Sequence, residues 1–297
     1  MQCLTKQPHL PMRRRRPLTG ALGILAMAIL LGACASPVST GLPVTSVPPS
    51  PTPSPAPGTA VVYDSLPGVL PPNMPSQPFQ AQQTFEFGDY VHLGGSIRAL
   101  RTVSFVMSDW ALAADYPALP STGWAYPLTC NIYAVIPGVP ANHLGALLGS
   151  LSQSFVMPWR PAEDPAAPLL YGKHGWTASN GLFYNGFAFK VTFDMTSLEL
   201  TLPDQVIIGI AYNTQTYGAI PTGLNGPYNS LNVGVEGIAT VGRDDDPDRV
   251  FWNTITAAWY ADQGAAGIGI FREDTNWAAA FAVPSLSSLP IQITAAP

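Results

Sequence analysis

The densest group of side chains capable of chemistry is an acidic run at residues 243–249. Asp244, Asp245, Asp246 and Asp248 fall within five positions, and an arginine stands on each side of them. Neighbouring carboxylates repel one another, and a cation that prefers oxygen ligands, such as Ca²⁺, relieves that repulsion. We nevertheless interpret the run as a solvated acidic loop, because the spacing fits no EF-hand and the arginines neutralise part of the charge. The alternative is a calcium site formed by these four aspartates.

A second group with binding chemistry is aromatic and lies in the long segment 158–181. Trp159 and Trp176 stand there among Gly, Pro and polar residues. An indole ring offers a flat apolar face to the C–H face of a sugar, and loops on a rigid scaffold are where binding groups tend to lie. We expect these two rings to be exposed and to bind an extended glycan, with hydrogen bonds from Arg160 and Asn180. The alternative is that both rings pack into the end of the domain, because tryptophan is often largely buried.

Signatures of catalysis are missing from the sequence. It contains no HExxH, no G-x-S-x-G, no Walker loop, no dinucleotide fingerprint and no CxxC. A glycosidase needs two carboxylates across a cleft, and the sequence offers candidates without a way to pair them: Glu86, Glu163, Glu199, Glu236 and Glu273. The residue types thus favour a non-catalytic binding or structural module over an extracytoplasmic polysaccharide hydrolase, which stays as the alternative. We expect the three histidines of the domain, His92, His143 and His174, to be surface residues of loops and strands.

The first 33 residues have the pattern of a signal peptide. Four arginines at 13–16 precede the apolar run 21–31, which is shorter than the roughly 18 to 20 residues that span a bilayer. The chain then reads Leu31-Gly32-Ala33-Cys34, which resembles the lipobox of bacterial lipoproteins. The resemblance implies cleavage before Cys34, a diacylglycerol on its thiol, and attachment to a membrane outside the cytoplasm. A plain secretory peptide is the alternative, and translation starting at Met12 would leave the pattern intact.

The residues after Cys34 predict an extended stalk, and the acidic balance of the mature chain argues against nucleic acid as a partner. Residues 34–60 are dominated by Pro, Ser and Thr, a composition that cannot bury enough apolar surface to fold and favours an extended chain. Removal of residues 1–33 takes away five basic and no acidic side chains, which leaves 8 basic against 18 acidic ones. This acidic balance argues against nucleic acid as a partner and against electrostatic docking on anionic lipid. The lipid on Cys34 is the expected link to the membrane.

The remainder, residues 61–297, predicts one all-β domain. Short runs alternate between apolar and polar residues, as in 103–108 and 187–194, and turn-rich segments separate them. Further strands are expected at 85–93, 147–157, 205–213, 231–235 and 251–260. About nine or ten such strands fit an antiparallel β-sandwich, which we expect to be jelly-roll-like, with long loops at 111–126, 158–181 and 237–250. The alternation around Cys130 places this thiol in the core rather than in a reactive site.

Four segments carry a resemblance to a family. They are Met107–Leu112, Pro158–Ala162, Gly226–Gly234 and Phe271–Trp277. With these segments the chain resembles an uncharacterised family of exported bacterial β-sandwich domains that are held on various cell-envelope anchors. The resemblance implies location and fold, and it transfers no catalytic residue.

Overall fold

The computed structural model of the protein describes residues 58–138, 142–170, 172–213, 226–276 and 288–297. These residues all belong to one compact unit, Pro53–Pro297. The predicted signal peptide, Cys34 and most of the predicted linker lie outside the described residues.

The described part of the chain is built from β-strands and four short 3-10 helices. The strands are β1 (Ala60–Asp64), β2 (Ser76–Gln77), β3 (Thr84–His92), β4 (Ala99–Asp109), β5 (Trp124–Val135), β6 (Leu144–Met157), β7 (Leu169–Leu170), β8 (Lys173–His174), β9 (Trp176–Thr177), β10 (Phe183–Tyr184), β11 (Phe187–Asp194), β12 (Gln205–Ala211), β13 (Leu231–Gly234), β14 (Val250–Thr254), β15 (Arg272–Asp274) and β16 (Ile291–Ala296). The helices are η1 (Ala113–Asp115), η2 (Thr196–Leu198), η3 (Pro227–Ser230) and η4 (Ala257–Trp259). The all-β prediction is confirmed.

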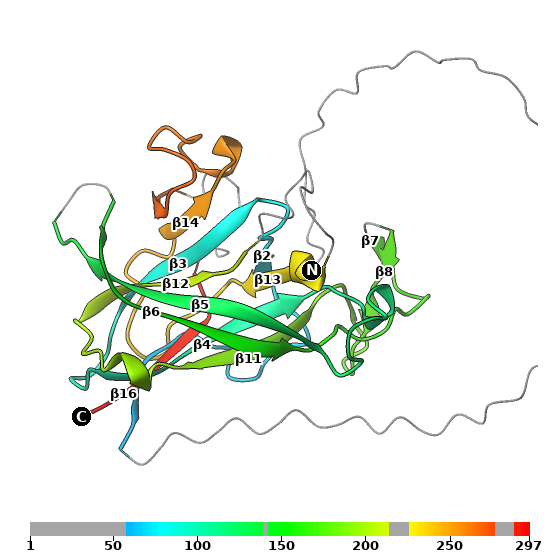
Figure 1. The fold of residues 1–297 in the computed structure, drawn as a ribbon, viewed down its shortest axis with the longest axis horizontal. Coiled ribbons are helices and arrows are strands. Elements are labelled where there is room, and N and C mark those ends of the chain that lie inside the picture. Colours follow the sequence, from blue (N-terminus) through cyan, green and yellow to red (C-terminus); the bar gives the residue numbers. More distant parts are fainter. Residues whose placement is uncertain (1–57, 139–141, 171, 214–225, 277–287) are drawn as a thin grey trace, which may run out of the picture. The chain divides into compact units, whose positions relative to one another are not determined.

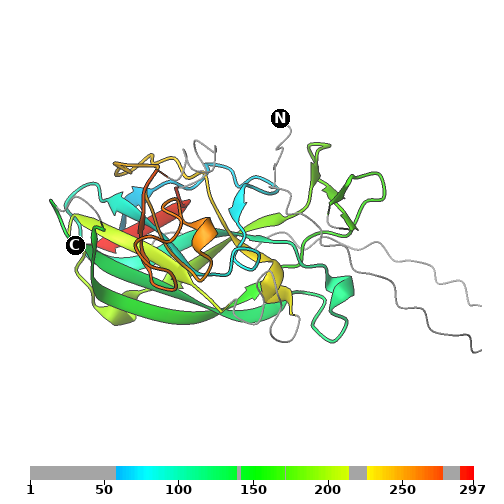
Figure 2. The ribbon, with the colours of Figure 1, turned by 90° about the horizontal axis from the view of Figure 1, so that it is seen from above.

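Two antiparallel sheets form the sandwich (Figures 1 and 2). One sheet has the order β1-β16-β4-β11, and β13 with β2 continues it beside the last residues of β4. The other has the order β15-β14-β3-β12-β5-β6. Eight principal strands remain when the short strands β2, β7 to β10 and β13 and the outer strands β14 and β15 are set aside. They are β1, β3, β4, β5, β6, β11, β12 and β16. If these are numbered 1 to 8 along the chain, their order is 1-8-3-6 in one sheet and 2-7-4-5 in the other. This is the strand order of a jelly roll, so the predicted architecture is confirmed down to its topology.

Alternation along the strands explains why the two sheets pack together. Val103, Phe105 and Met107 of β4 face the core beside Val191 and Phe193 of β11, as the sequence pattern predicts. From the opposite sheet the core receives a second set of fully buried apolar side chains, including Phe87, Val91, Cys130, Ile132 and Ile208. Burial raises the pKa of the Cys130 thiol, which behaves here as a small apolar residue. The prediction of an inert core cysteine is confirmed.

Some boundaries differ from the predicted ones. The predicted strand 251–260 ends at Thr254, where η4 and a turn-rich loop take over. The predicted loop 158–181 contains the strand pair β7 with β8 and also β9, which pairs with β10 just beyond the loop. β5 contains Pro127, which lacks an N–H for a sheet ladder. Pairing with β12 reaches only Thr129, so Pro127 lies where β5 has a neighbour on one side alone.

Candidate functional site

A cavity of about 330 Å³ opens where β4 and β6 end and where β5, β11 and β13 begin. The small strands β7 and β8 project from this end of the sandwich (Figures 1 and 2). The volume of the cavity lies at the small end of the range for ligand pockets, about 300 to 1,000 Å³. The cavity is lined by Gln80, Trp110, Ala111, Leu112, Asp115, Tyr116, Arg160, Leu170, Lys173, Asn185 and Ser230. Most of these residues come from connecting segments, which a rigid sandwich holds in place.

Asp109, the last residue of β4, organises the wall of the cavity. Its Oδ1 accepts a hydrogen bond from the Ala111 N–H at 2.9 Å, and its Oδ2 accepts one from Trp124 Nε1 at 2.9 Å. The carbonyl of Ala111 in turn accepts the N–H of Arg160 at 3.1 Å. The Trp110 N–H donates to the Ser230 carbonyl at 3.0 Å. Three segments far apart in sequence are thus tied together by backbone hydrogen bonds around one buried carboxyl group.

Burial raises the pKa of Asp109 to about 7, although the bonds from Ala111 and Trp124 and the nearby Arg160 favour its charged form. A carboxyl group with this pKa is largely neutral in mildly acidic solution and largely charged above neutrality. The charge behind the cavity wall therefore changes within the range of pH that cells and their surroundings reach.

Arg160 is the most unusual residue of the cavity because its guanidinium is buried and only partly bonded. The residue is 4 % exposed. Nη2 donates to the His174 carbonyl at 2.9 Å and lies 3.8 Å from Oε1 of Glu163. Nε and Nη1 are both buried and have no hydrogen-bond partner among the described residues. Burial lowers the pKa of Arg160, yet an arginine stays charged near neutrality, and the carboxyl groups of Glu163, Asp115 and Asp109 lie near enough to favour its charge.

Two aromatic side chains, Trp110 and Tyr116, add apolar faces to the cavity. Trp110 Nε1 donates to Ser108 Oγ at 3.1 Å, which fixes the ring against β4. Gly186 permits this position, since a Cβ there would lie 2.5 Å from Trp110 Nε1. Tyr116 stacks on Trp159 with ring centroids 5.7 Å apart and planes inclined by 12°. Both rings are held by neighbours and still line the cavity, as a binding platform requires.

The mouth of the cavity carries one ion pair. Lys173 Nζ donates to Asp115 Oδ1 at 2.7 Å, and both side chains are exposed. Asp115 is the one carboxylate among the described lining residues. A glycosidase acting through two carboxyl groups needs a second one about 5 to 10 Å away. The arrangement offers binding groups of both polarities rather than an acid and base pair.

The two tryptophans predicted to bind a ligand have other roles in the structure. The expectation that Trp176 is exposed is wrong: it is 8 % exposed, packs on Tyr184 and Phe187, and donates through Nε1 to the Gly186 carbonyl at 2.8 Å. A polar loop can bury an indole in this way because a nearby carbonyl satisfies its N–H. Trp159 is half-buried, donates to the Pro120 carbonyl at 2.8 Å and supports Tyr116 from behind. Neither ring lines the cavity.

Of the two polar residues predicted beside these tryptophans, Arg160 lines the cavity and Asn180 does not. Asn180 is exposed and stabilises its own turn, with Oδ1 accepting the Leu182 N–H at 3.0 Å and Nδ2 donating to the Tyr184 hydroxyl at 2.9 Å. It does not line the cavity. Arg160 does, and it is the one predicted ligand-binding residue that the structure places there.

The four aspartates predicted to bind calcium do not converge. Asp244 accepts the Ser288 hydroxyl at 2.6 Å, Asp245 pairs with Arg243 and lies 3.5 Å from His92 Nδ1, and Asp246 pairs with Arg249 at 3.1 Å. Oδ1 of Asp244 and Oδ1 of Asp246 also accept backbone N–H groups of Asp246 and Asp248. No group of three or more metal-ligating side chains occurs among the described residues. These contacts agree with the solvated acidic loop, because Asp244, Asp245 and Asp246 each already have a local donor, and the calcium site stays a prediction.

Sequence reasoning also missed a buried ion cluster. The sequence predicts a surface position for His143, yet its Nδ1 lies 2.6 Å from Oε2 of Glu273, a carboxylate whose side chain is 3 % exposed. The Glu273 Oε1 pairs with Arg249 at 3.1 Å. The cluster ties the segment before β6 to β14 and β15. A pattern along one strand cannot show it, because its members come from separate segments and His143 lies more than a hundred residues from Arg249 and Glu273.

Comparisons of the chain with protein-family models, with curated proteins and with solved structures give no match. Among the described residues, no helix has the length and apolar character to cross a membrane. The fold and the cavity define an all-β jelly roll with a small, mixed aromatic and cationic cavity at its loop end.

Proposed function

We propose that the protein is a lipid-anchored module outside the cytoplasm that binds a glycan of the cell envelope in the cavity at its loop end. The observation that carries the proposal is the pairing of aromatic faces, Trp110 and Tyr116, with directional polar groups in one cavity of about 330 Å³. Sugars combine apolar C–H faces with hydroxyl groups, so they need both kinds of contact. Binding is preferred to hydrolysis because the lining offers a single carboxylate, Asp115, already paired with Lys173.

The anchoring half of the proposal rests on the lipobox-like Leu31-Gly32-Ala33-Cys34 after the arginines and the apolar run. Each buried CH₂ contributes about 0.8 kcal/mol, so a multiply acylated Cys34 is a durable anchor. The following Pro-rich residues would hold the sandwich away from the membrane surface.

A glycan array with the full-length protein in detergent tests the binding half. We expect Trp110→Ala to abolish binding to the glycans that the wild type retains. Trp259→Ala is the matched control, since Trp259 is also partly buried but does not line the cavity. Equal loss in both variants at equal folded fraction, or no retained glycan, would contradict the proposal.

Labelling cells with a radioactive fatty acid tests the anchor. The wild type should incorporate label and sediment with membranes, and Cys34→Ala should do neither. Label that persists in the variant would show that another residue is acylated or that the lipobox assignment is wrong.

A further inference from the structure

The strand β6 leaves one edge of its sheet without a partner. It is the longest strand of the described chain, it lies beside β5 (Figure 1), and among the described strands it pairs with β5 alone. The backbone hydrogen bonds that the described residues make outside the strand ladders do not involve residues 144–157. Alternate N–H and C=O groups along the other side of β6 therefore have no partner among the described residues. Such a row is a template for the addition of another strand.

The other long edge strands carry features that prevent such pairing. β11, which pairs with β4 alone, contains Lys190 and Asp194, and β1 contains Asp64 and a β-bulge. Charged side chains and bulges discourage a second strand from adding to an edge. β6 has no charged residue and no proline in its 14 positions, and its pairing with β5 is regular over residues 149–157. This edge is thus the open one of the sandwich among the described strands.

The side chains on the outer face of β6 suit pairing with a copy of the same strand. Three exposed serines, Ser150, Ser152 and Ser154, alternate there with residues that face inward. Two of them already bond to the neighbouring strand: the hydroxyl oxygens of Ser152 and Thr129 lie 2.6 Å apart, and Ser150 Oγ donates to Asn131 Oδ1 at 2.7 Å. A hydroxyl group both donates and accepts, so a serine can form a hydrogen bond with a serine of a second copy.

One antiparallel register places all three serines opposite serines. With a two-fold axis at Ser152, this residue faces its own copy, and Ser150 faces Ser154 of the second copy. On the inner face the same register places Gly149 opposite Phe155, so the aromatic ring meets a residue without a side chain. No like charges meet, since the strand has no charge. A surface that matches its own copy about a two-fold axis is what a symmetric dimer requires.

We propose that two copies of the protein form a symmetric dimer by antiparallel pairing of β6 with β6, centred on Ser152. The two sheets that contain β6 then join across the two-fold axis into one continuous sheet. None of the residues that line the cavity belongs to β6, so the dimer stands or falls independently of glycan binding. Together with the proposed glycan binding, a dimer would hold an envelope polymer at two cavities, which strengthens its retention.

Oxidation of the full-length protein in detergent, followed by a non-reducing gel, tests the interface. Ser152→Cys places two thiols opposite each other, where the Cα atoms of an antiparallel pair are about 4.5 to 5.5 Å apart, within reach of a disulfide. We expect at least five times as much disulfide-linked dimer from Ser152→Cys as from Ser121→Cys, whose parent residue is exposed in a loop. The wild type, with its buried Cys130, sets the background. Equal yields from the two variants would overturn the proposal.

A mixed experiment tests the register. Ser150→Cys alone and Ser154→Cys alone should give little dimer, because each thiol lies four residues, about 13 Å along the strand, from its own copy. The two variants produced together in one cell should give at least five times as much dimer as either variant alone. A yield from Ser150→Cys alone that equals the yield of the mixture would overturn the centring on Ser152.

A charge at the centre of the interface provides a test by disruption. Ser152→Lys, added to both chains of the mixed experiment, places two ammonium groups opposite each other, and like charges there destabilise strand pairing. The dimer yield should fall at least fivefold at unchanged β-sheet content, as measured by circular dichroism. Ser121→Lys adds the same charge to the exposed loop and should leave the yield unchanged. Equal yields with the two lysines would overturn the proposal.

Discussion

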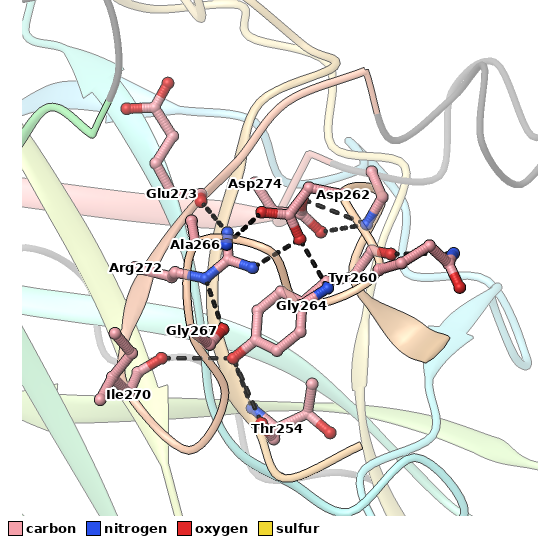
Figure 3. A network of polar contacts seen from close by, with 12 residues as sticks. Thr254, Tyr260, Asp262, Gly264, Ala266, Gly267, Ile270, Arg272, Glu273 and Asp274 are labelled. Atoms are coloured by element: carbon pink, nitrogen blue, oxygen red, sulfur yellow. Dashed lines mark hydrogen bonds and ion pairs between the residues drawn. The ribbon is translucent and has the colours of Figure 1, made fainter. Parts of the chain in front are cut away.

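The two most deeply buried arginines of the described chain have the same exposure and opposite hydrogen bonding. Arg160 and Arg272 are each 4 % exposed. All three guanidinium nitrogens of Arg272 donate, to the Gly267 carbonyl at 3.0 Å, to the Glu273 carbonyl at 2.9 Å and to Asp262 Oδ1 at 2.7 Å (Figure 3). Arg160 has one hydrogen bond to a carbonyl and two nitrogens without a described partner.

The two arginines differ in how many of their guanidinium nitrogens the folded protein uses as hydrogen-bond donors. Arg272 lies over the Tyr260 ring at 3.9 Å from its centroid, and with Asp262 it closes the loop between β14 and β15 (Figure 3). Asp274 contributes from the same strand by accepting Trp252 Nε1 at 3.0 Å and the Ala261 N–H. Every strong donor there is used within the protein, so no binding capacity remains. At Arg160, Nε and Nη1 are buried without a described partner, so the same residue type is incompletely bonded beside a cavity.

Matched substitutions of the two arginines should have the largest effect. Arg272→Met removes three charge-assisted hydrogen bonds and leaves buried acceptors without donors, so we expect a loss of about 3 kcal/mol or more in the free energy of unfolding. Arg160→Met removes one such bond but also removes two unsatisfied donors, so its stability should lie within about 1 kcal/mol of the wild type. Urea denaturation with linear extrapolation measures both values.

Equal losses in the free energy of unfolding of Arg272→Met and Arg160→Met would contradict the comparison. A large loss in Arg160→Met would mean that its nitrogens have partners in the folded protein. Lys190→Met serves as a control for removing a partly buried positive charge from a strand, and it should change stability little.

The pH dependence of stability should run in opposite directions at two carboxyl groups, Asp109 in one region and Asp262 in the other. Burial raises the pKa of Asp109 to about 7 from an unfolded value near 3.8. Between these values the folded protein holds a proton that the unfolded chain has released, so stability is greatest at the acidic end and falls as the pH rises to about 7. Burial also acts on Asp262, but bonds from Arg272 and two backbone N–H groups outweigh it and lower its pKa. Its contribution is present above pH 4 and is lost on further acidification.

Denaturation at pH 4.5, 6 and 7.5 checks the sign. The wild type should lose up to about 3 kcal/mol across this range, which is somewhat less than the shift in the pKa of Asp109 would give alone. Asp109→Asn should reduce the slope without abolishing it, because burial also raises the pKa of Asp89, whereas Asp262→Asn should leave the slope unchanged. A wild-type stability that rises from pH 4.5 to 7.5 would contradict the assignment to Asp109.

The sequence predicts the fold well because apolar and polar residues alternate along each strand, and the apolar ones form the core of the sandwich. The runs 103–108 and 187–194 fall in β4 and β11, which pair in register from Asp109↔Phe187 to Thr102↔Asp194. The pairing of β1 with β16 is not predictable in this way, because it joins residues at opposite ends of the domain. β1 also begins at Ala60, one residue before the predicted domain boundary.

The candidate site could be predicted only in part, for a different physical reason. Three of the segments on which the family resemblance rests contribute to the cavity through Trp110, Arg160 and Ser230. The sequence singles out Arg160 but ranks it behind Trp159 and Trp176. Whether an indole is exposed depends on a carbonyl within reach, as Gly186 is for Trp176. Whether a guanidinium is satisfied likewise depends on contacts between distant segments, which no spacing rule contains.

A smaller effect should follow from filling the space beside Trp110. A Cβ at Gly186 would lie 2.5 Å from Trp110 Nε1 and 2.5 Å from Ser108 Oγ. Gly186→Ala should therefore shift the ring and cost about 1 to 3 kcal/mol through overpacking. It should also weaken ligand binding. Gly68→Ala is the control, since nothing lies within 4 Å of its added Cβ. Unchanged binding in Gly186→Ala would show that the position of Trp110 does not matter to the ligand.

The smallest expected effect concerns the acidic run 243–249, where the distinction between used and unused groups applies to carboxylates. Asp245 and Asp246 pair with Arg243 and Arg249, and Asp244 accepts the Ser288 hydroxyl and a backbone N–H. A calcium ion would have to displace these partners, so little binding energy would remain. Ligand binding to the folded state raises stability by linkage, and the absence of binding leaves it unchanged. Melting in millimolar calcium and in chelator should therefore agree to within about 1 °C. A rise of several degrees in calcium, abolished by Asp244→Asn, would support the calcium site and show that this loop keeps part of its polar capacity for a ligand.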